Sequence, residues 1–210
     1  NAFAKIRNAG FDAVLLGAGL DRLNEIIPLA LLKGLEIHAW MWTLNCNDKK
    51  IIENHPDWYN VNRNGDTSYN KPAYVPYYKW LCPSNMEARE YVNSKVNELS
   101  KIKGLAGMHL DYIRHPDVIL PIALQPTYGI VQDKEYPEYD YCYCENCKSR
   151  FRKEYGLSVD EMDDPTQSKE WKEFRYSLIK EVVEGANQHV SPDKELSAAV
   201  FQHLYLPENL

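Results

Sequence analysis

The chain lacks three features that would place it in other classes of protein. Its mean hydropathy is −0.53, and no apolar run approaches the ~20 residues of a membrane span. Basic residues are in the minority, with 24 Lys and Arg against 30 Asp and Glu, so no broad basic face for nucleic acid is expected. Gly and Pro number only 10 and 12 in 210 residues, too few for a collagen-like or disordered chain. The composition predicts a globular protein.

Phenylalanine is also scarce, whereas the polar aromatic residues are abundant. There are 5 Phe against 15 Tyr and 5 Trp. Tyr and Trp combine a flat apolar face with a polar edge, which suits stacking against polar, ring-shaped ligands. The alternative is that these residues fill half-exposed packing positions.

The first residue is Asn1, and no charged-then-apolar leader follows it. Either a signal peptide has been removed, which would imply export, or the chain is cut from a longer one.

Short apolar runs alternate with amphipathic segments along the whole chain. Strands are expected over 12–17, 35–42, 105–111 and 196–204, and helices over 2–9, 21–33, 84–104, 145–155 and 168–189. A strand of the 12–17 type, almost wholly apolar, is expected to be buried on both faces. The third helix is expected to begin with a capping box of Ser84 and Glu87.

This alternation predicts an α/β fold with a parallel sheet. We expect a single domain over 1–210 that forms part of a (β/α)8 TIM barrel, with a doubly wound open sheet as the rival. Long polar and aromatic excursions at 43–83 and 112–143 follow two of the strands. The carboxyl ends of barrel strands form the functional face, so these excursions are expected to build the site.

The sequence disfavours a dinucleotide-binding loop. Gly17 and Gly19 follow the first strand, but Arg22 stands where the fingerprint needs a third glycine.

The cysteines give the strongest spacing signal. Cys142, Cys144 and Cys147 lie within six residues, and three such thiolates can converge on one tetrahedral ion, typically structural Zn²⁺. Cys82 is the natural fourth ligand, with Cys46 and His55 as alternatives. Free thiols or disulfides remain the other interpretations, although five cysteines leave one over.

Asp111 is the candidate catalytic residue. In a strand, His109 and Asp111 point to one side and Met108 and Leu110 to the other. A carboxylate at a strand end can act as nucleophile, acid, base or acceptor of a sugar hydroxyl, and Arg114 could pair with it or with a ligand. A loop-capping role is the alternative.

His38, Trp40 and Trp42 share one face of the preceding strand. If this face opens into a barrel mouth, the two indoles and the imidazole form a stacking platform beside Asp111. Otherwise the tryptophans pack beneath a helix.

Three segments together resemble glycoside hydrolase-like TIM-barrel proteins, which are common in bacteria. They are Trp80-Leu81-Cys82-Pro83-Ser84-Asn85, Gly107–Arg114, and C-x-C-x2-C from Cys142 to Cys147, followed by Phe151 and Tyr155-Gly156. The set is similar to family 10-like glycosyl hydrolases, and the cysteine pattern is similar to that of family 42 β-galactosidases.

The resemblance implies the second to fifth strands of a barrel and a structural zinc held by Cys82, Cys142, Cys144 and Cys147. It also implies hydrolysis of O-glycosidic bonds in an oligo- or polysaccharide, with no organic cofactor. Family 42 carries a Glu where this chain has Asp111, and the second carboxylate has no convincing candidate here. His38, Trp40, Trp42, His109 and Arg114 are the expected substrate-binding residues. Two other functions remain open: a non-catalytic carbohydrate-binding protein with a degenerate barrel, and a metal-dependent hydrolase of another class.

Overall fold

The computed structural model describes residues 2–200 and contains a parallel sheet of four strands in the order β1-β2-β3-β4. The strands are β1 (Ala13–Leu16), β2 (Glu36–Trp42), β3 (Gly107–Asp111) and β4 (Glu195–Ala198). Each strand pairs in parallel with its neighbour, as the sequence predicts. The last expected strand is shorter than 196–204, and the part of that prediction beyond residue 200 lies outside the described residues.

The helices alternate with the strands. They are α1 (Ala2–Asn8), α2 (Leu20–Leu31), α3 (Lys49–Asn54), α4 (Met86–Ser100), α5 (Glu145–Tyr155) and α6 (Lys169–Gln188). Short 3-10 turns occupy Pro56–Trp58, Gln125–Tyr128, Pro137–Tyr139, Val159–Glu161 and Pro165–Gln167. Among residues 2–200, no helix is long and apolar enough to span a membrane.

The start of α4 differs from the expected capping box. Asn85, not Ser84, is the N-cap, and its side chain accepts a hydrogen bond from the Ala88 backbone N–H at 3.0 Å. Glu87 accepts instead from the indole of Trp58 at 3.0 Å. Both Ser and Asn are good N-caps, and Glu87 at the second helical position ties the helix to the preceding excursion.

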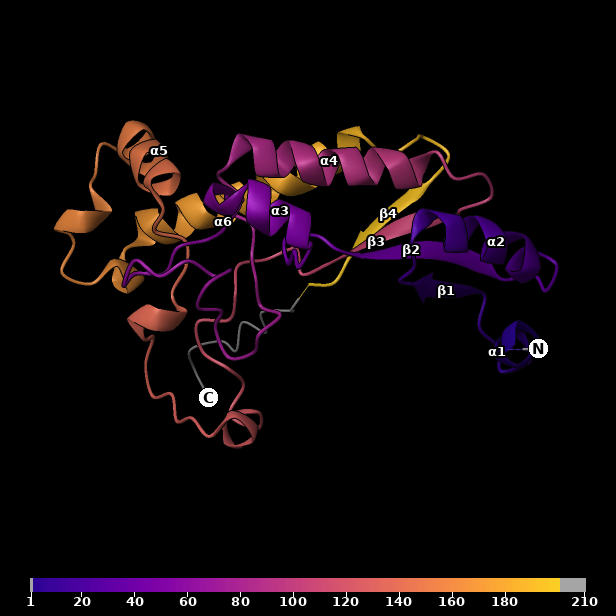
Figure 1. Cartoon of the computed structure of the whole chain (residues 1–210), viewed down its shortest axis with the longest axis horizontal. Coiled ribbons are helices and arrows are strands. Elements are labelled where there is room, and N and C mark those ends of the chain that lie inside the picture. Colours follow the sequence, from indigo (N-terminus) through magenta and orange to yellow (C-terminus); the bar gives the residue numbers. More distant parts are fainter. Residues whose placement is uncertain (1, 201–210) are drawn as a thin grey trace, which may run out of the picture.

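Helices α2, α4 and α6 cover one face of the sheet, and within residues 2–200 none of them lies on the other face, which we call the open face (Figure 1). Ile27, Val92 and Val182 of these helices belong to the same buried core as Ile37 and Met108 of the strands. The expectation that β1 is buried on both faces is wrong, because the helices cover only one face and Leu15, on the other, is exposed.

The excursions 43–83 and 112–143 gather at the carboxyl ends of the strands, below and to the left of the sheet in Figure 1. A second apolar core lies there between α5, α6 and both excursions. Its members include Cys82, Tyr141, Phe151, Trp171 and Phe174. The excursions are therefore ordered, packed segments that build one end of the molecule.

Gly107 allows β3 to lie close to its neighbours. A Cβ atom at this position would lie 2.5 Å from the Glu195 carbonyl oxygen and 2.6 Å from His38 Nδ1. We expect Gly107→Ala to lower the free energy of unfolding by about 1–3 kcal/mol, because a β4 backbone atom must move. Urea unfolding measures this loss.

Gly185→Ala in α6 is the matched control. Its new methyl would meet only the movable side chain of Asn93, at 3.0 Å, and alanine favours the helix by about 1 kcal/mol. Equal stabilities for the two variants would contradict the tight approach at Gly107.

Candidate functional site

Asp111 ends β3 and lies beside Trp40 of β2. The indole Nε1–H of Trp40 donates to Asp111 Oδ2 at 3.2 Å, and the Tyr112 backbone N–H donates to Asp111 Oδ1 at 2.8 Å. The strand register explains the first contact. Trp40 pairs with His109 and Trp42 with Asp111, so Trp40 and Asp111 are diagonal neighbours on the same face of the sheet. Both oxygens of the carboxylate thus face donors, the arrangement that suits an ionised acceptor.

The chain turns sharply after Asp111. Tyr112 has φ +50°, a left-handed conformation that costs a non-glycine residue free energy and is frequent at functional sites. Its ring packs edge-on against Trp42, with centroids 5.2 Å apart, and against Trp80 at 5.3 Å. Burial raises the pKa of Tyr112, and Tyr77 and Asp111 raise it further. The turn is therefore held by aromatic packing around a neutral phenol.

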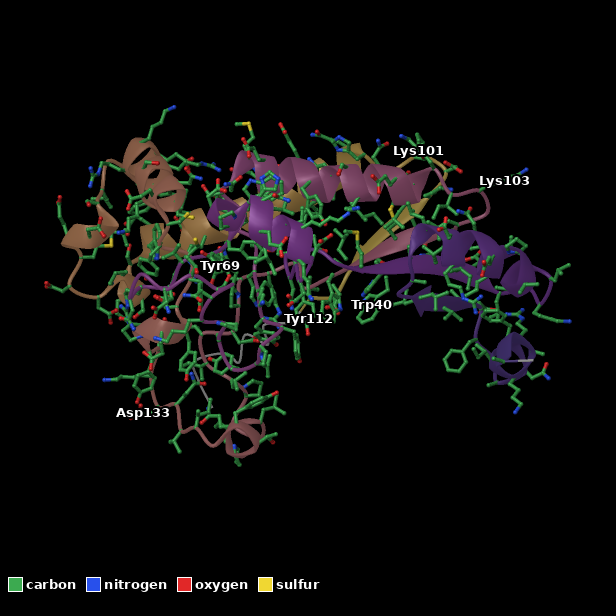
Figure 2. All side chains as sticks on the ribbon, in the orientation of Figure 1. Trp40, Tyr69, Lys101, Lys103, Tyr112 and Asp133 are labelled. Atoms are coloured by element: carbon green, nitrogen blue, oxygen red, sulfur yellow. The ribbon has the colours of Figure 1, made fainter. Side chains whose placement is uncertain are left out.

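Three exposed rings surround this strand end and form what we call the aromatic platform: Trp40, Trp42 and Tyr77. Their exposed fractions are 38%, 40% and 43%. Trp42 lies edge-on to Trp40 at 6.4 Å and stacks on Tyr77 at 5.9 Å. In Figure 2, the side chains of Trp40 and Tyr112 lie together at the strand ends, on the open side of the sheet. Sequence reasoning missed Tyr77; its only signal was the tyrosine excess of 43–83.

His38 lies deeper in the sheet than the exposed rings of the platform. It pairs with Gly107, whereas Trp42 pairs with Asp111, and four residues of strand span about 13 Å. Its side chain is buried, and Nε2 lies 4.0 Å from Glu36 Oε2. Shared parity places His38 on the face of Trp40, two residues further along the strand, but its burial puts it deeper in the sheet than the exposed rings.

His109 and Arg114 take different positions. His109 is partly exposed on the open face, and its Nδ1 lies 2.9 Å from Ser197 Oγ of β4. Arg114 forms an ion pair with Asp117 at 2.9 Å rather than with Asp111, and its guanidinium lies over the rings of Trp80 and Tyr112, 5.3 and 5.6 Å from their centroids. Arg114 thus supports the aromatic cluster beneath the platform.

The second excursion is anchored to α6 by polar groups. The fully buried Asp140 accepts from Arg175 at 2.9 Å and from the Tyr143 hydroxyl at 2.5 Å. His115 Nε2 lies 3.2 Å from the Arg175 carbonyl oxygen, and burial, together with the Arg175 charge, lowers the pKa of His115 to about 3. His115 is therefore a neutral structural residue.

Four cysteines converge at the far side of the excursions: Cys82, Cys142, Cys144 and Cys147. Their sulfur atoms all lie within 4.8 Å of one another. Cys82 Sγ is 3.5 Å from Cys144 and Cys147 and 3.7 Å from Cys142, close to the edge of about 3.8 Å of a ZnS₄ tetrahedron with 2.3 Å bonds. The four side chains can hold a metal ion, and these separations exceed a disulfide bond of about 2.05 Å.

The chemistry of the four sulfurs also fits a cation. Hydrogen bonds from Cys142, Cys147 and Cys82 lower the pKa of Cys144, while burial raises that of Cys142. The thiols are thus hydrogen-bonded to one another, and a bound metal ion would take the place of their protons. Cys144 is the N-cap residue of α5, and Cys147 lies in the first turn of this helix. The helix dipole favours thiolates at these positions. The Val61 backbone N–H donates to Cys142 Sγ at 3.4 Å.

The two alternative ligands are elsewhere. Cys46 lies near Tyr59, whose hydroxyl donates to the Cys46 carbonyl at 3.0 Å. His55 stacks on Trp58, with ring centroids 3.9 Å apart. Among the described residues, the cluster that could bind a metal consists of the four cysteines that the resemblance implied.

The fold defines the class of structure. Four parallel strands in sequence order, with their connecting helices on one face and their excursions at the carboxyl ends, form part of a (β/α)8 TIM barrel.

Comparisons with known proteins agree with this class. Residues 10–112, just under half of the chain, match the family model described as hypothetical glycosyl hydrolase 6. A comparison with curated proteins gives no match.

Solved structures show the same fold at low sequence identity. A β-galactosidase from Halorubrum lacusprofundi has a TM-score of 0.64 and 14% identity, covering 93% of this chain and 33% of its own. Gan42B, a GH42 β-galactosidase from G. stearothermophilus, has 0.62 and 11%, with coverages of 94% and 32%. The β-galactosidase from Rahnella sp. R3 has 0.61 and 11%, with 93% and 32%. The chain thus spans about a third of the length of the structures it matches. The expected similarity to glycoside hydrolases is confirmed at this level, whereas the family 10-like assignment is not.

Proposed function

We propose that this protein hydrolyses O-glycosidic bonds of an oligo- or polysaccharide and that Asp111 is one of its two catalytic carboxylates. The observation that carries the proposal is the position of Asp111 at a strand end, hydrogen-bonded to Trp40 and surrounded by the aromatic platform. The glycosyl hydrolase family model and the barrel fold support it.

Asp111 would act as nucleophile, as acid or base, or as acceptor of a sugar hydroxyl. The two N–H groups that face its oxygens hold the carboxyl group in place. Glycoside hydrolysis needs a second carboxylate, about 5–5.5 Å away for retention or about 6.5–9.5 Å away for inversion. We assign that role to another strand end of the barrel.

The platform would hold the sugar. Flat indole and phenol faces stack on the apolar faces of sugar rings, so Trp40, Trp42 and Tyr77 would bind one or more rings beside Asp111. His109, on the same open face, would orient a hydroxyl. Arg114 would act as a positioning residue through Trp80 and Tyr112. His38, whose imidazole lies close to Gly107, would help to pack β3 against β2.

We further propose that the four cysteines bind one structural Zn²⁺. With all four positions filled by sulfur, the ion would have no open site for substrate. It would fix the first excursion to α5 and so keep the platform in place. Catalysis would depend on the ion only through the shape of the site.

The hydrogen bond from Trp40 makes a sharp test of this function. Trp40→Phe keeps an aromatic ring but removes the N–H that donates to Asp111. We expect kcat to fall about 10-fold, the effect of losing one hydrogen bond to a charged group, with little change in KM. The assay uses the intact protein and a panel of nitrophenyl glycosides that includes a β-galactoside.

Trp58→Phe is the matched control, because the Trp58 indole donates to Glu87, away from the strand ends. It should leave kcat unchanged. An unchanged kcat in Trp40→Phe would contradict the role assigned to this hydrogen bond, and the absence of hydrolysis across the panel, with sugar still bound, would favour a binding protein.

A further inference from the structure

A cavity of about 440 Å³ lies on the helix-covered side of the sheet, between the start of α2 and the face of α4. Gly19 and Leu20 form one wall, and Tyr91 and Lys95 form the other. Asp111, Trp40 and Tyr77 are not part of its lining, whereas Trp42 of the aromatic platform is. The volume is within the range of about 300–1,000 Å³ that is usual for small-molecule sites.

The floor of this cavity contains two buried polar groups that have no hydrogen-bond partner among residues 2–200. They are Thr43 Oγ1 and Asn45 Nδ2. The two residues are only 2% and 3% exposed. Leaving such a group unpaired costs about 1–3 kcal/mol, which a ligand oxygen would offset. The amide oxygen of Asn45 already has a partner, since Oδ1 accepts a hydrogen bond from Asn47 Nδ2 at 2.9 Å.

The start of α2 supplies further donors to the same cavity. Gly19 is the N-cap of this 12-residue helix and has no side chain to accept from the first turn. The first N–H groups of a helix have no partner within it. The walls therefore offer hydrogen-bond donors from two independent elements.

The charges of the lining decide the class of ligand. The lining contains two acidic residues, Asp48 and Glu98, and one basic residue, Lys95, which forms an ion pair with Glu98 at 3.5 Å. Burial raises the pKa of Tyr91, as do Cys46 and Asp48, so its hydroxyl is neutral. With more acids than bases, the cavity disfavours phosphate or carboxylate despite the helix N-terminus. It fits a neutral ligand whose hydroxyls both donate and accept.

We propose that this cavity binds a neutral sugar, as a second carbohydrate site on the α4 side of the strand ends, beside the aromatic platform. The choice of a sugar among hydroxyl-rich ligands rests on the proposed function. Trp42 belongs both to the lining of this cavity and to the aromatic platform, so the two sites are neighbours.

The test compares glucose with glucuronate, which differ in the charge at C6. Amide signals of the ¹⁵N-labelled intact protein are followed during titration. Glucose should shift the signals of Thr43, Asn45 and Gly19, with glucuronate binding more weakly. Thr43→Val, which removes one unpaired hydroxyl, should weaken glucose binding about 3- to 10-fold. Ser84→Ala is the matched control, because Ser84 Oγ is also buried without a partner among residues 2–200 but lies outside this cavity.

Three results would overturn the proposal: no glucose-induced shifts at these residues, equal affinity in Thr43→Val, or glucuronate binding as tightly as glucose. If Thr43→Val fails to fold, Lys95→Met serves instead, because this side chain is half-exposed; it should weaken glucose binding by a similar factor. Shifts at the cavity without hydrolysis by the protein would support this site while counting against the proposed function.

Discussion

Asp111→Asn is expected to lower kcat by about 10²–10⁴-fold, the contribution of a positioned catalytic carboxylate. The side-chain amide keeps the size of the carboxylate but cannot accept a proton or attack a sugar carbon. It also has one acceptor oxygen where two donors converge, from Trp40 and from the Tyr112 backbone. Steady-state kinetics on the best substrate of the panel would measure the change, with thermal unfolding as a check on folding.

Asp133→Asn is the control for this experiment. Asp133 lies in the second excursion, far from Trp40 and Tyr112 in Figure 2, and its carboxylate accepts from the Tyr136 hydroxyl at 2.7 Å. Activity should be unchanged. If Asp111→Asn retained full activity, Asp111 would be a loop cap rather than a catalytic group. If the protein bound sugars but neither form hydrolysed them, the barrel would be a carbohydrate-binding module.

Cys82→Ser is expected to release the metal and to lower the unfolding temperature by about 10 °C or more. A structural zinc site contributes directly to folding, and a loss of about 3–5 kcal/mol in a chain of this size corresponds to such a shift. Elemental analysis should find about one zinc ion per chain before the substitution and none after it.

Cys46→Ser is the matched control, since Cys46 is buried but outside the cluster. It should keep the zinc. A well-folded protein without metal would contradict the structural site. Removal of the metal that abolished activity without loosening the fold would favour a metal-dependent hydrolase of another class.

The parity of residues along a strand predicted much of the candidate site. Trp40, Trp42 and Asp111 lie together because adjacent parallel strands are in register, and this follows from two short sequence runs. Parity fails for His38 because it carries no information about depth. His38 is the third of seven residues in β2 and is buried, whereas Trp40 and Trp42 on the same face are exposed.

Contacts within the excursions could not be predicted in the same way. The ion pair of Arg114 with Asp117 and the stacking of Tyr77 on Trp42 depend on irregular backbone, for which residue spacing gives no periodic rule. For the cysteine cluster, spacing indicated Cys142, Cys144 and Cys147, and the family resemblance favoured Cys82 over the other candidates for the fourth position.

The cysteine cluster also affects the unfolded chain. Cys82 and Cys142 are 60 residues apart, and the segment between them contains α4, β3 and Asp111. Closing a loop of this length costs about 4 kcal/mol of chain entropy. A metal bound by these thiols would offset that entropy. The segment that contains β3 would then be a closed loop while β3 pairs with β2 and β4, which lie outside it.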